Sequence, residues 1–255
     1  MFLLFSQLTF GQNPYYYSID RTNGLPSNSV YDIFQDSKGF MWFATGKGLC
    51  RYDGSVFKTF TSDTQTSKSG SCINEDSFGR IWYCNFDGYL YYVENGELKN
   101  LPQKESVGYM KYGIIKDKLF LMQSKSVAVY DLKTLQLVYS YPVLNENTRA
   151  TFVSNSKFYF IGECIYEIDY PKKIKTYSLT EDFIKTLEVP IVQKLKNEFF
   201  VVSKFSNYYY TYKDNQLSKK KFNSSFDFIQ NLATVDNLPW LCTPNGIIKY
   251  ENDKA

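Results

Sequence analysis

The chain of 255 residues contains no histidine, and this absence limits the chemistry that its side chains can perform. Histidine is the commonest general base and the commonest zinc ligand. Acids such as Asp87, Asp131 and Glu163 fall in expected loops, but nothing in the sequence brings two of them within the roughly 5–10 Å that paired acid and base catalysis needs. We therefore expect no catalytic residue, no metal site and no cofactor in this chain.

The five cysteines offer little further chemistry, because they form no CxxC motif and an odd number cannot pair completely. Cys72 and Cys84 fall on successive strands of one expected hairpin. If Glu75 faces Arg80 across the turn, Cys72 faces Tyr83, and a Cys72–Cys84 bridge would need a register slip. We favour buried free thiols that pack as small apolar side chains, which are Cys50, Cys72, Cys84, Cys164 and Cys242.

The charge balance argues against a nucleic acid or an anionic membrane as partner. The 29 basic and 26 acidic residues leave a formal net charge of only +3. The densest basic run, Lys219-Lys220-Lys221, lies beside an alternating segment, which favours an edge strand that its lysines keep soluble. No run of 18 or more apolar residues occurs, so we expect no membrane span in this sequence.

The elements that would position any functional residue repeat at a nearly constant interval. Aromatic residues make up 18% of the chain while helical periodicity is almost absent, which favours strands. A period near 40 with strand signals alone predicts an all-β propeller of four-stranded blades, with six blade units in this chain. We expect one aromatic anchor of each unit to be buried where adjacent blades face each other. The anchors lie 38 to 41 residues apart and are Trp42, Trp82, Phe120, Tyr159, Phe200 and Trp240.

The first unit shows the blade pattern most clearly. Its strands are expected at residues 29–35, 40–45, 49–53 and 56–61. The turn Asp36-Ser37-Lys38-Gly39 recurs as Asp76-Ser77-Phe78-Gly79, in which the carboxylate can accept backbone N–H groups and glycine can take a positive φ. This recurrence indicates folding chemistry rather than catalysis.

The later units depart from this pattern. Units 3 to 5 lose the Asp-x-x-Gly turn, and residues 180–187 favour a helical turn between blades 4 and 5. The sixth unit supplies three strands, at 229–235, 239–243 and 247–251. We expect residues 15–19 to form the N-terminal strand that completes the last blade. Whether six or seven blades close the ring stays open.

The amino-terminal residues 1–11 resemble a secretory signal peptide, although the usual basic segment is missing. This favours an exported protein located in the periplasm or elsewhere outside the cytoplasm. Residues 12–255 are expected to form a single propeller domain that is cut short at its C-terminus.

Residues 23–61 resemble the two-component regulator propeller repeat, found in periplasmic sensors of Bacteroidetes hybrid and LytS-type histidine kinases. The resemblance rests on Gly24-Leu25, Asn28-Ser29-Val30, Asp36-x-x-Gly39 and Trp42 with Thr45, followed by Gly48-Leu49 and Tyr52-Asp53. It extends more loosely over residues 15–253. It implies a seven-bladed propeller, followed by an immunoglobulin-like domain, a membrane helix and a kinase as partners within the same protein. A homodimer is a further expected assembly.

Three functions fit this sequence to different degrees. The first is an extracytoplasmic propeller that binds a ligand for a two-component sensor and is not itself catalytic. The alternative is an exported scaffold or protein-interaction module without signalling output. A propeller lyase, which has similar Gly-x-aromatic-Trp strands, is less favoured because such lyases are expected to use a histidine and a metal.

The candidate ligand-binding residues lie in the loops between the second and third strands of the blades. In a propeller these loops open on the same face as the links between blades. Their mixture of charges suits a glycan or another neutral or zwitterionic small ligand, and the alternatives are a solvated face or a docked partner domain. Surface aromatics such as Phe86 and Phe205 could stack on sugars. The candidates are Lys47, Phe86, Asp87, Lys125, Glu163, Asn207 and Asn245.

Overall fold

The computed structural model describes residues 18–250, with the exception of 104–105, 107–110, 144–147, 149, 155, 163, 172–173, 179–189, 196–197, 214–215, 224–226, 237 and 245. The helical turn expected at 180–187 therefore lies outside the described residues. No helix in the described part is long and apolar enough to cross a membrane.

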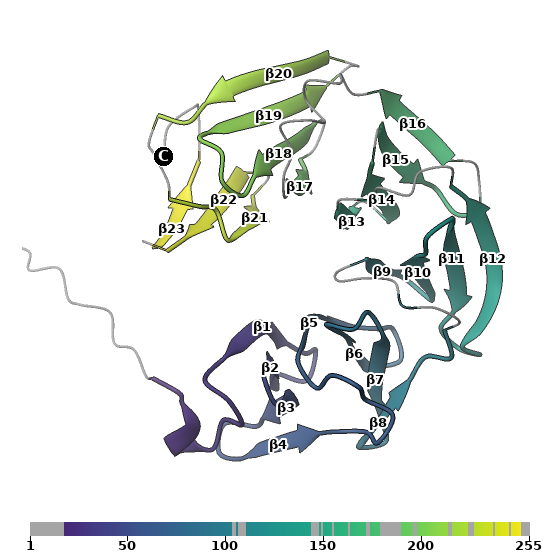
Figure 1. Cartoon of the computed structure of the whole chain (residues 1–255), viewed down its shortest axis with the longest axis vertical. Coiled ribbons are helices and arrows are strands. Elements are labelled where there is room, and N and C mark those ends of the chain that lie inside the picture. Colours follow the sequence, from purple (N-terminus) through teal and green to yellow (C-terminus); the bar gives the residue numbers. More distant parts are fainter. Residues whose placement is uncertain are drawn as a thin grey trace, which may run out of the picture.

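Six antiparallel sheets are arranged around a common centre, as Figure 1 shows. Within each sheet the strands follow one another in sequence order, from the innermost strand to the outermost. Five sheets have four strands, and the last has three strands among the described residues. The short 3₁₀-helix η1 (Arg21–Asn23) precedes the first sheet. The predicted all-β propeller with six blade units is confirmed.

The strands of the first three blades have the following bounds. Blade 1 contains β1 (Val30–Gln35), β2 (Met41–Thr45), β3 (Gly48–Tyr52) and β4 (Phe57–Phe60). Blade 2 contains β5 (Gly70–Glu75), β6 (Ile81–Asn85), β7 (Leu90–Glu94) and β8 (Glu97–Asn100). Blade 3 contains β9 (Tyr112–Ile115), β10 (Lys118–Met122), β11 (Ser126–Asp131) and β12 (Gln136–Pro142).

The remaining blades continue the same order. Blade 4 contains β13 (Ala150–Ser154), β14 (Lys157–Ile161), β15 (Cys164–Ile168) and β16 (Ile174–Ser178). Blade 5 contains β17 (Pro190–Lys194), β18 (Phe199–Ser203), β19 (Tyr208–Lys213) and β20 (Gln216–Lys221). Blade 6 contains β21 (Asn231–Val235), β22 (Leu238–Thr243) and β23 (Gly246–Lys249).

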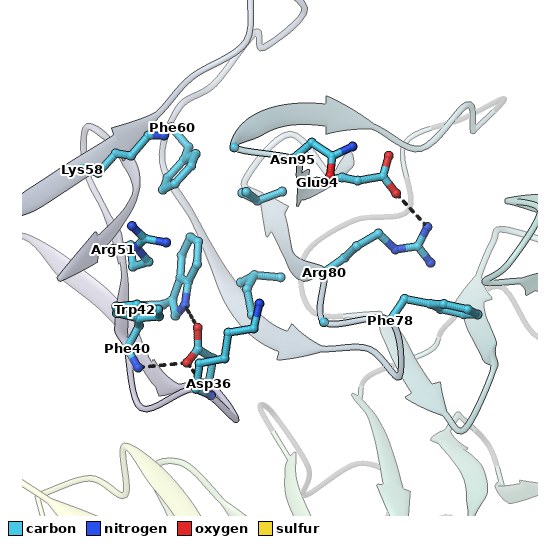
Figure 2. A pocket seen from close by; sticks show the side chains of 15 residues that line it. Asp36, Phe40, Trp42, Arg51, Lys58, Phe60, Phe78, Arg80, Glu94 and Asn95 are labelled. Carbon is cyan, nitrogen blue, oxygen red and sulfur yellow. Dashed lines mark hydrogen bonds and ion pairs between the residues drawn. The ribbon is translucent and has the colours of Figure 1, made fainter. Parts of the chain in front are cut away.

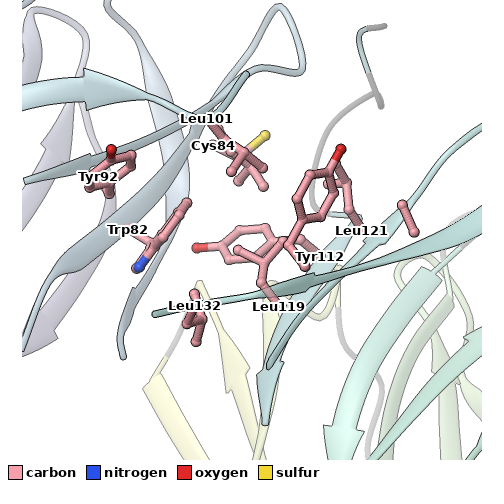
Figure 3. Close-up of a cluster of buried hydrophobic side chains, with 11 residues drawn as sticks. Trp82, Cys84, Tyr92, Leu101, Tyr112, Leu119, Leu121 and Leu132 are labelled. Carbon is pink, nitrogen blue, oxygen red and sulfur yellow. The ribbon is translucent and has the colours of Figure 1, made fainter. Parts of the chain in front are cut away.

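The aromatic anchors hold neighbouring blades together. Trp42 packs with side chains of blade 2, and Trp82 belongs to one buried cluster with side chains of blade 3, among them Leu119 and Tyr112 (Figure 3). The anchors of blades 3, 4 and 5 pack in the same way against the blade that follows each of them. All five are at most 3% exposed, so nearly all of each ring is removed from water at a blade boundary. Trp240 differs from the prediction, because it is only half-buried.

The Asp-x-x-Gly turns form as predicted. One oxygen of Asp36 accepts the backbone N–H of Lys38 at 3.0 Å and of Phe40 at 2.9 Å, and Gly39 takes a φ of +87°. The other oxygen accepts the indole N–H of Trp42 at 2.8 Å. The aspartate therefore fixes the turn and the anchor at the same time.

The register of blade 2 differs from the sequence-based prediction. Glu75 pairs with Ile81 rather than with Arg80, and a bulge follows Ser71, which lies opposite Cys84. Cys72 lies in this bulge with a φ of +59°. All five cysteines are free thiols, as expected, although only two of them, Cys50 and Cys84, are fully buried.

The outer and terminal strands test two further predictions. Lys219-Lys220-Lys221 lies on β20, the exposed outermost strand of blade 5, so the edge-strand prediction is confirmed. Most of the N-terminal strand expected to complete the last blade lies outside the described residues. Its last two residues, Ser18 and Ile19, are described and are not in a strand, and Ile19 packs instead beside Phe43 in blade 1.

Candidate functional site

One face of the propeller carries the turns between the second and third strands, and we call it the loop face. Backbone hydrogen bonds connect these turns to the chain that leaves each blade. Val143, directly after β12, donates its N–H to the carbonyl of Lys125 at 2.9 Å, and Phe222, directly after β20, donates to Asn207 at 2.9 Å. The turns and the inter-blade links therefore share one face, as the sequence analysis expected.

The structure places five of the seven candidate residues on this face. Lys47, Phe86, Asp87, Lys125 and Asn207 all lie in turns between second and third strands, and all are exposed. The other two, Glu163 and Asn245, lie outside the described residues. The candidates belong to different blades, except for Phe86 and Asp87.

The turns of blades 1 and 2 are joined through one linking residue. Ser69 precedes β5 and donates its hydroxyl to the carbonyl of Gly46 at 3.0 Å. Its own carbonyl accepts the backbone N–H of Phe86 at 2.9 Å. The turn that carries Lys47 is thereby held next to the turn that carries Phe86 and Asp87.

An exposed aromatic pair lies at this junction. The rings of Tyr31 on β1 and Phe86 meet edge to face with their centroids 4.8 Å apart. Tyr31 is 47% exposed and Phe86 is 38% exposed, so much of both rings remains open to solvent. Such a pair provides a rigid apolar surface on which a flat ligand face can pack.

Hydrogen bonds hold the acidic side of the same turn in place. The carboxylate of Asp87 accepts the hydroxyl of Thr66, and Asn85 accepts the backbone N–H of Tyr89 at 2.8 Å. Asn85 also donates its amide to the carbonyl of Ser67 at 3.1 Å. The carboxylate of Asp87 is therefore presented from a rigid turn rather than from a mobile loop tip.

Below this junction, Asp32 and a bulge connect the inner strands. The carboxylate of Asp32 accepts the N–H of Ile73 at 2.7 Å, across the blade boundary. Burial raises the pKa of Asp32, and the backbone hydrogen bonds that it accepts only partly oppose this shift. Tyr112 of blade 3 then donates its hydroxyl to the carbonyl of Cys72. Blades 1, 2 and 3 are thus tied together beneath the candidate residues.

Sequence reasoning missed Tyr31, Ser69 and Thr66. Tyr31 lies on an innermost strand rather than in a loop, although its alternation with the partly buried positions of β1 could have indicated an exposed side chain. Ser69 and Thr66 belong to the link between blades, where nothing in the sequence distinguishes one polar residue from the next.

The loop face offers two ammonium groups, a carboxylate, a carboxamide and an exposed aromatic pair. These groups can donate to and accept from hydroxyl groups while a ring packs on Tyr31 and Phe86. Within the described residues, no three histidine, cysteine or acidic side chains converge in a way that could hold a metal ion. The arrangement is a polar face with an exposed aromatic pair on a β-propeller.

Residues 24–47 match the family model described as two component regulator propeller. These residues include Asp36, Gly39 and Trp42, whose hydrogen bonds form the turn of blade 1. The match confirms the resemblance that the sequence indicated, and the chain therefore contains a two component regulator propeller repeat. No curated protein sequence matches the chain.

Solved structures share the fold at low sequence identity. One of them is described as the extracellular domain of the hybrid two component system BT3049 from B. thetaiotaomicron. It is 17% identical to this chain, with a TM-score of 0.65 over 92% of this chain and 35% of that chain. PorZ, a surface component of the type-IX secretion system of Porphyromonas gingivalis, is 12% identical, with a TM-score of 0.63 over 89% of this chain and 32% of that chain. This chain spans about a third of each.

A lyase also shares the fold. A catalytically inactive virginiamycin B lyase from Staphylococcus aureus, in which an alanine replaces a histidine, was solved with quinupristin. It is 12% identical to this chain, with a TM-score of 0.66 over 87% of this chain and 84% of the lyase. The similarity to all three structures establishes the propeller fold, which hosts several different functions.

Proposed function

We propose that this chain is the extracytoplasmic ligand-binding propeller of a two-component sensor, and that it is not catalytic. The observation that carries the proposal is the exposed Tyr31–Phe86 pair, held beside Lys47 and Asp87 on the loop face. The match of residues 24–47 to the two component regulator propeller model supports the sensor assignment. The shared fold with the extracellular domain of a hybrid two component system supports it further.

The ligand of this face would be a neutral or zwitterionic molecule rich in hydroxyl groups, such as a glycan. One ring of the ligand would pack on Tyr31 and Phe86, while Lys47 and Asp87 exchange hydrogen bonds with its hydroxyls. A polyanion fits less well, because the carboxylate of Asp87 lies next to the aromatic pair. Lys125 and Asn207 would contact the more distant parts of a longer ligand.

The experiment is a binding screen of the full chain against a panel of neutral oligosaccharides, followed by titration calorimetry on any that bind. Lys47→Ala and Asp87→Ala should each weaken binding about tenfold, as expected for a lost hydrogen bond to a charged group. Tyr31→Ala should weaken it at least as much. Lys133→Ala is the matched control, because Lys133 is exposed in the turn between β11 and β12, away from the loop face.

Two results would contradict the binding proposal. If a confirmed oligosaccharide binds all three variants as tightly as it binds the parent, its site lies elsewhere on the propeller. If no member of the panel binds at millimolar concentration, a hydroxyl-rich ligand is not recognised by this face.

A second candidate function is an exported scaffold without signalling output, favoured by the shared fold with PorZ, a surface component of a secretion system. The coding sequence that follows residue 255 separates the two functions. A membrane helix followed by a kinase would support the sensor, and a surface-anchoring or secretion-linked domain would support the scaffold.

A lyase activity is the least favoured function. The related lyase is catalytically inactive when an alanine replaces one histidine, and this chain contains no histidine at all. Incubation of the chain with quinupristin, followed by mass spectrometry, tests this directly. Conversion of the substrate by the purified chain would overturn the non-catalytic assignment.

A further inference from the structure

A cavity of about 440 Å³ lies between blades 1 and 2, at the face opposite the loop face. Its lining includes the turns after β1, β5 and β7. These turns join first to second strands or third to fourth strands, and they therefore lie at the opposite ends of the blades from the turns that carry Lys47 and Phe86. Figure 2 shows Trp42 and Phe60 on the blade 1 side and Arg80 on the blade 2 side. A volume of this size is typical of small-molecule sites.

The cavity is more cationic than the chain as a whole. Four basic side chains line it, Lys38, Arg51, Lys58 and Arg80, against two carboxylates. Its floor is apolar and rigid, because Trp42, Phe60, Ile81 and Val93 are all at most 9% exposed.

The two carboxylates of the cavity are already engaged. Asp36 accepts the backbone N–H groups of its own turn and the indole of Trp42. Glu94 pairs with Lys99 at 3.1 Å and with Arg80 at 3.5 Å. The guanidinium of Arg80 is in turn held by Asp76 at 2.7 Å. These two acids therefore do not neutralise the remaining cations.

Lys38, Arg51 and Lys58 form no salt bridge within the described part of the chain. Asp53 attracts Arg51 electrostatically, but the hydrogen bonds of the Asp53 carboxylate go to its own turn. This carboxylate accepts the N–H of Ser55 at 2.9 Å and of Val56 at 2.8 Å.

Aromatic rings position two of these cations. The guanidinium carbon of Arg51 lies 4.3 Å from the ring centroid of Phe40, and the ammonium of Lys58 lies 5.1 Å from that of Phe60. Cation–π contacts of this kind hold the charged groups over the cavity without satisfying their N–H donors. The planar guanidinium of Arg51 can then donate two parallel hydrogen bonds to one carboxylate or sulfate.

We propose that this cavity, which we call the inter-blade site, binds a small organic anion that carries a carboxylate or sulfate group. Arg51 and Lys58 bind the anionic group, Lys38 adds to the local positive potential, and the apolar floor packs against the carbon skeleton of the ligand. The site is distinct from the loop face and does not depend on the function proposed for it.

The test is calorimetric titration of the full chain with three matched probes: sodium glucuronate, glucose 6-sulfate and glucose. Glucuronate and the sulfate share the sugar ring of glucose and differ from it by one anionic group. We expect the two anions to bind at about 150 mM salt and glucose to bind at least tenfold more weakly. Arg51→Gln, which keeps a polar and partly exposed side chain, should weaken glucuronate binding about tenfold.

Two further variants sharpen the test. Glu94→Gln removes a carboxylate from the lining and should strengthen glucuronate binding several-fold. Lys133→Gln removes an exposed positive charge from the same face in blade 3 and should leave binding unchanged. Equal binding of glucose and glucuronate, or equal binding of glucuronate to the parent and to Arg51→Gln, would overturn the proposal. Binding that disappears between about 20 and 150 mM salt would also overturn it, because it would reflect screened surface charge alone.

Discussion

Blades 1 and 2 and blades 3 and 4 reach the same packing with different turns between their first two strands. In blades 1 and 2 five residues separate the paired strand ends. Asp36 accepts the indole N–H of Trp42, and Asp76 accepts that of Trp82, each at 2.8 Å. In blades 3 and 4 only two residues separate the strand ends. In blade 3 the shorter turn consists of Lys116, at a φ of +54°, and Asp117, whose carboxylate pairs with Lys118 at 2.6 Å rather than with the anchor ring.

Blades 3 and 4, whose anchors are Phe120 and Tyr159, have a cross-strand ion pair and no aspartate–tryptophan bond. Lys118, the first residue of β10, pairs with Asp131 at 3.0 Å, and Lys157, the first residue of β14, pairs with Glu167 on β15. Burial would raise the pKa of Glu167, but hydrogen bonds from Lys157, Tyr177 and Tyr159 outweigh it and lower the pKa. The buried anchor ring is therefore common to these four blades, whereas the polar contacts near it differ from blade to blade.

Blade 6 combines the short turn with a tryptophan, and the aspartate of this turn, Asp236, does not bond to the indole. Val235 pairs directly with Leu238 across a two-residue turn, and the indole N–H of Trp240 has no hydrogen-bond partner among the described residues. Trp240 is also less buried than Trp42 and Trp82. A tryptophan without its supporting turn is therefore a weaker anchor.

The largest expected effect comes from removing an anchor. Trp82→Ala should lower the free energy of unfolding by about 3–5 kcal/mol, because a fully buried indole and its hydrogen bond are lost. Trp240→Ala should cost about 2 kcal/mol or less, since its ring is half-buried and its N–H is unpaired. Urea unfolding followed by circular dichroism measures both. Equal losses for the two variants would contradict the difference between the blades.

The next effect concerns the aspartate of the turn. Asp76 also holds the buried guanidinium of Arg80 at 2.7 Å, whereas the equivalent of Arg80 in blade 1 is the uncharged Phe40. Asp76→Ala should therefore cost about 3 kcal/mol, because it removes the closest ion-pair partner of a buried charge. Asp36→Ala should cost about 1–2 kcal/mol, as expected for lost hydrogen bonds alone. The same urea titrations measure the two values, and a larger cost for Asp36→Ala would refute this account.

A smaller effect tests the two types of turn. Gly39 has a φ of +87°, and a methyl group added at its Cα would meet no atom within 4 Å, so Gly39→Ala should cost about 1 kcal/mol through backbone strain alone. Lys116→Gly in blade 3 should instead stabilise the protein by about 0.5 kcal/mol, because glycine relieves a left-handed backbone at the expense of some unfolded-state entropy. The urea midpoint should therefore fall in Gly39→Ala and rise in Lys116→Gly. Shifts of the same sign would contradict the proposed difference in backbone strain between the two turns.

The smallest effect is a pH dependence that belongs to blade 3. The hydrogen bond from Lys118, followed by that from the backbone of Thr134, lowers the pKa of Asp131 to about 2. Since this pKa lies below the unfolded value, the stabilisation is present above about pH 4 and is lost as the pH falls through about 2. Asp131→Asn should therefore flatten the fall of the urea midpoint between pH 4 and 2. Lys118→Met should flatten it less, because the hydrogen bond from Thr134 remains, and an unchanged acid limb in both variants would exclude this pair as its source.

Much of the fold could be predicted because it follows from local patterns. The anchor spacing gave the blades, the Asp-x-x-Gly motif gave the turns, and β1 and β22 lie within two residues of the predicted ranges. The register of blade 2 was wrong because the bulge at Cys72 depends on Asp32 in the neighbouring blade, which the hairpin sequence does not contain. Trp240 was ranked with the other anchors because the sequence does not show how deeply a ring is buried.

The candidate site was predicted only in outline. The loop face and the exposure of Lys47, Asp87 and Lys125 follow from propeller topology. The partner of each side chain does not, since Thr66 and Tyr31 reach the site from other parts of the chain. The inter-blade site was not predicted, because Arg51 and Arg80 belong to different repeats and read separately as ordinary surface charges.

The sequence by itself determined the repeat, the strand order within each blade and the turns that open on the loop face, because these depend on residues that are close in the chain. Only the tertiary structure decided which side chains of neighbouring blades meet, because the packing of one twisted sheet against the next sets those distances. The edge-to-face pair of Tyr31 and Phe86 and the cations around the inter-blade site both arise in this way. Contacts within a blade can therefore be predicted from residues that are close in the chain, whereas contacts between blades depend on how the sheets pack against each other.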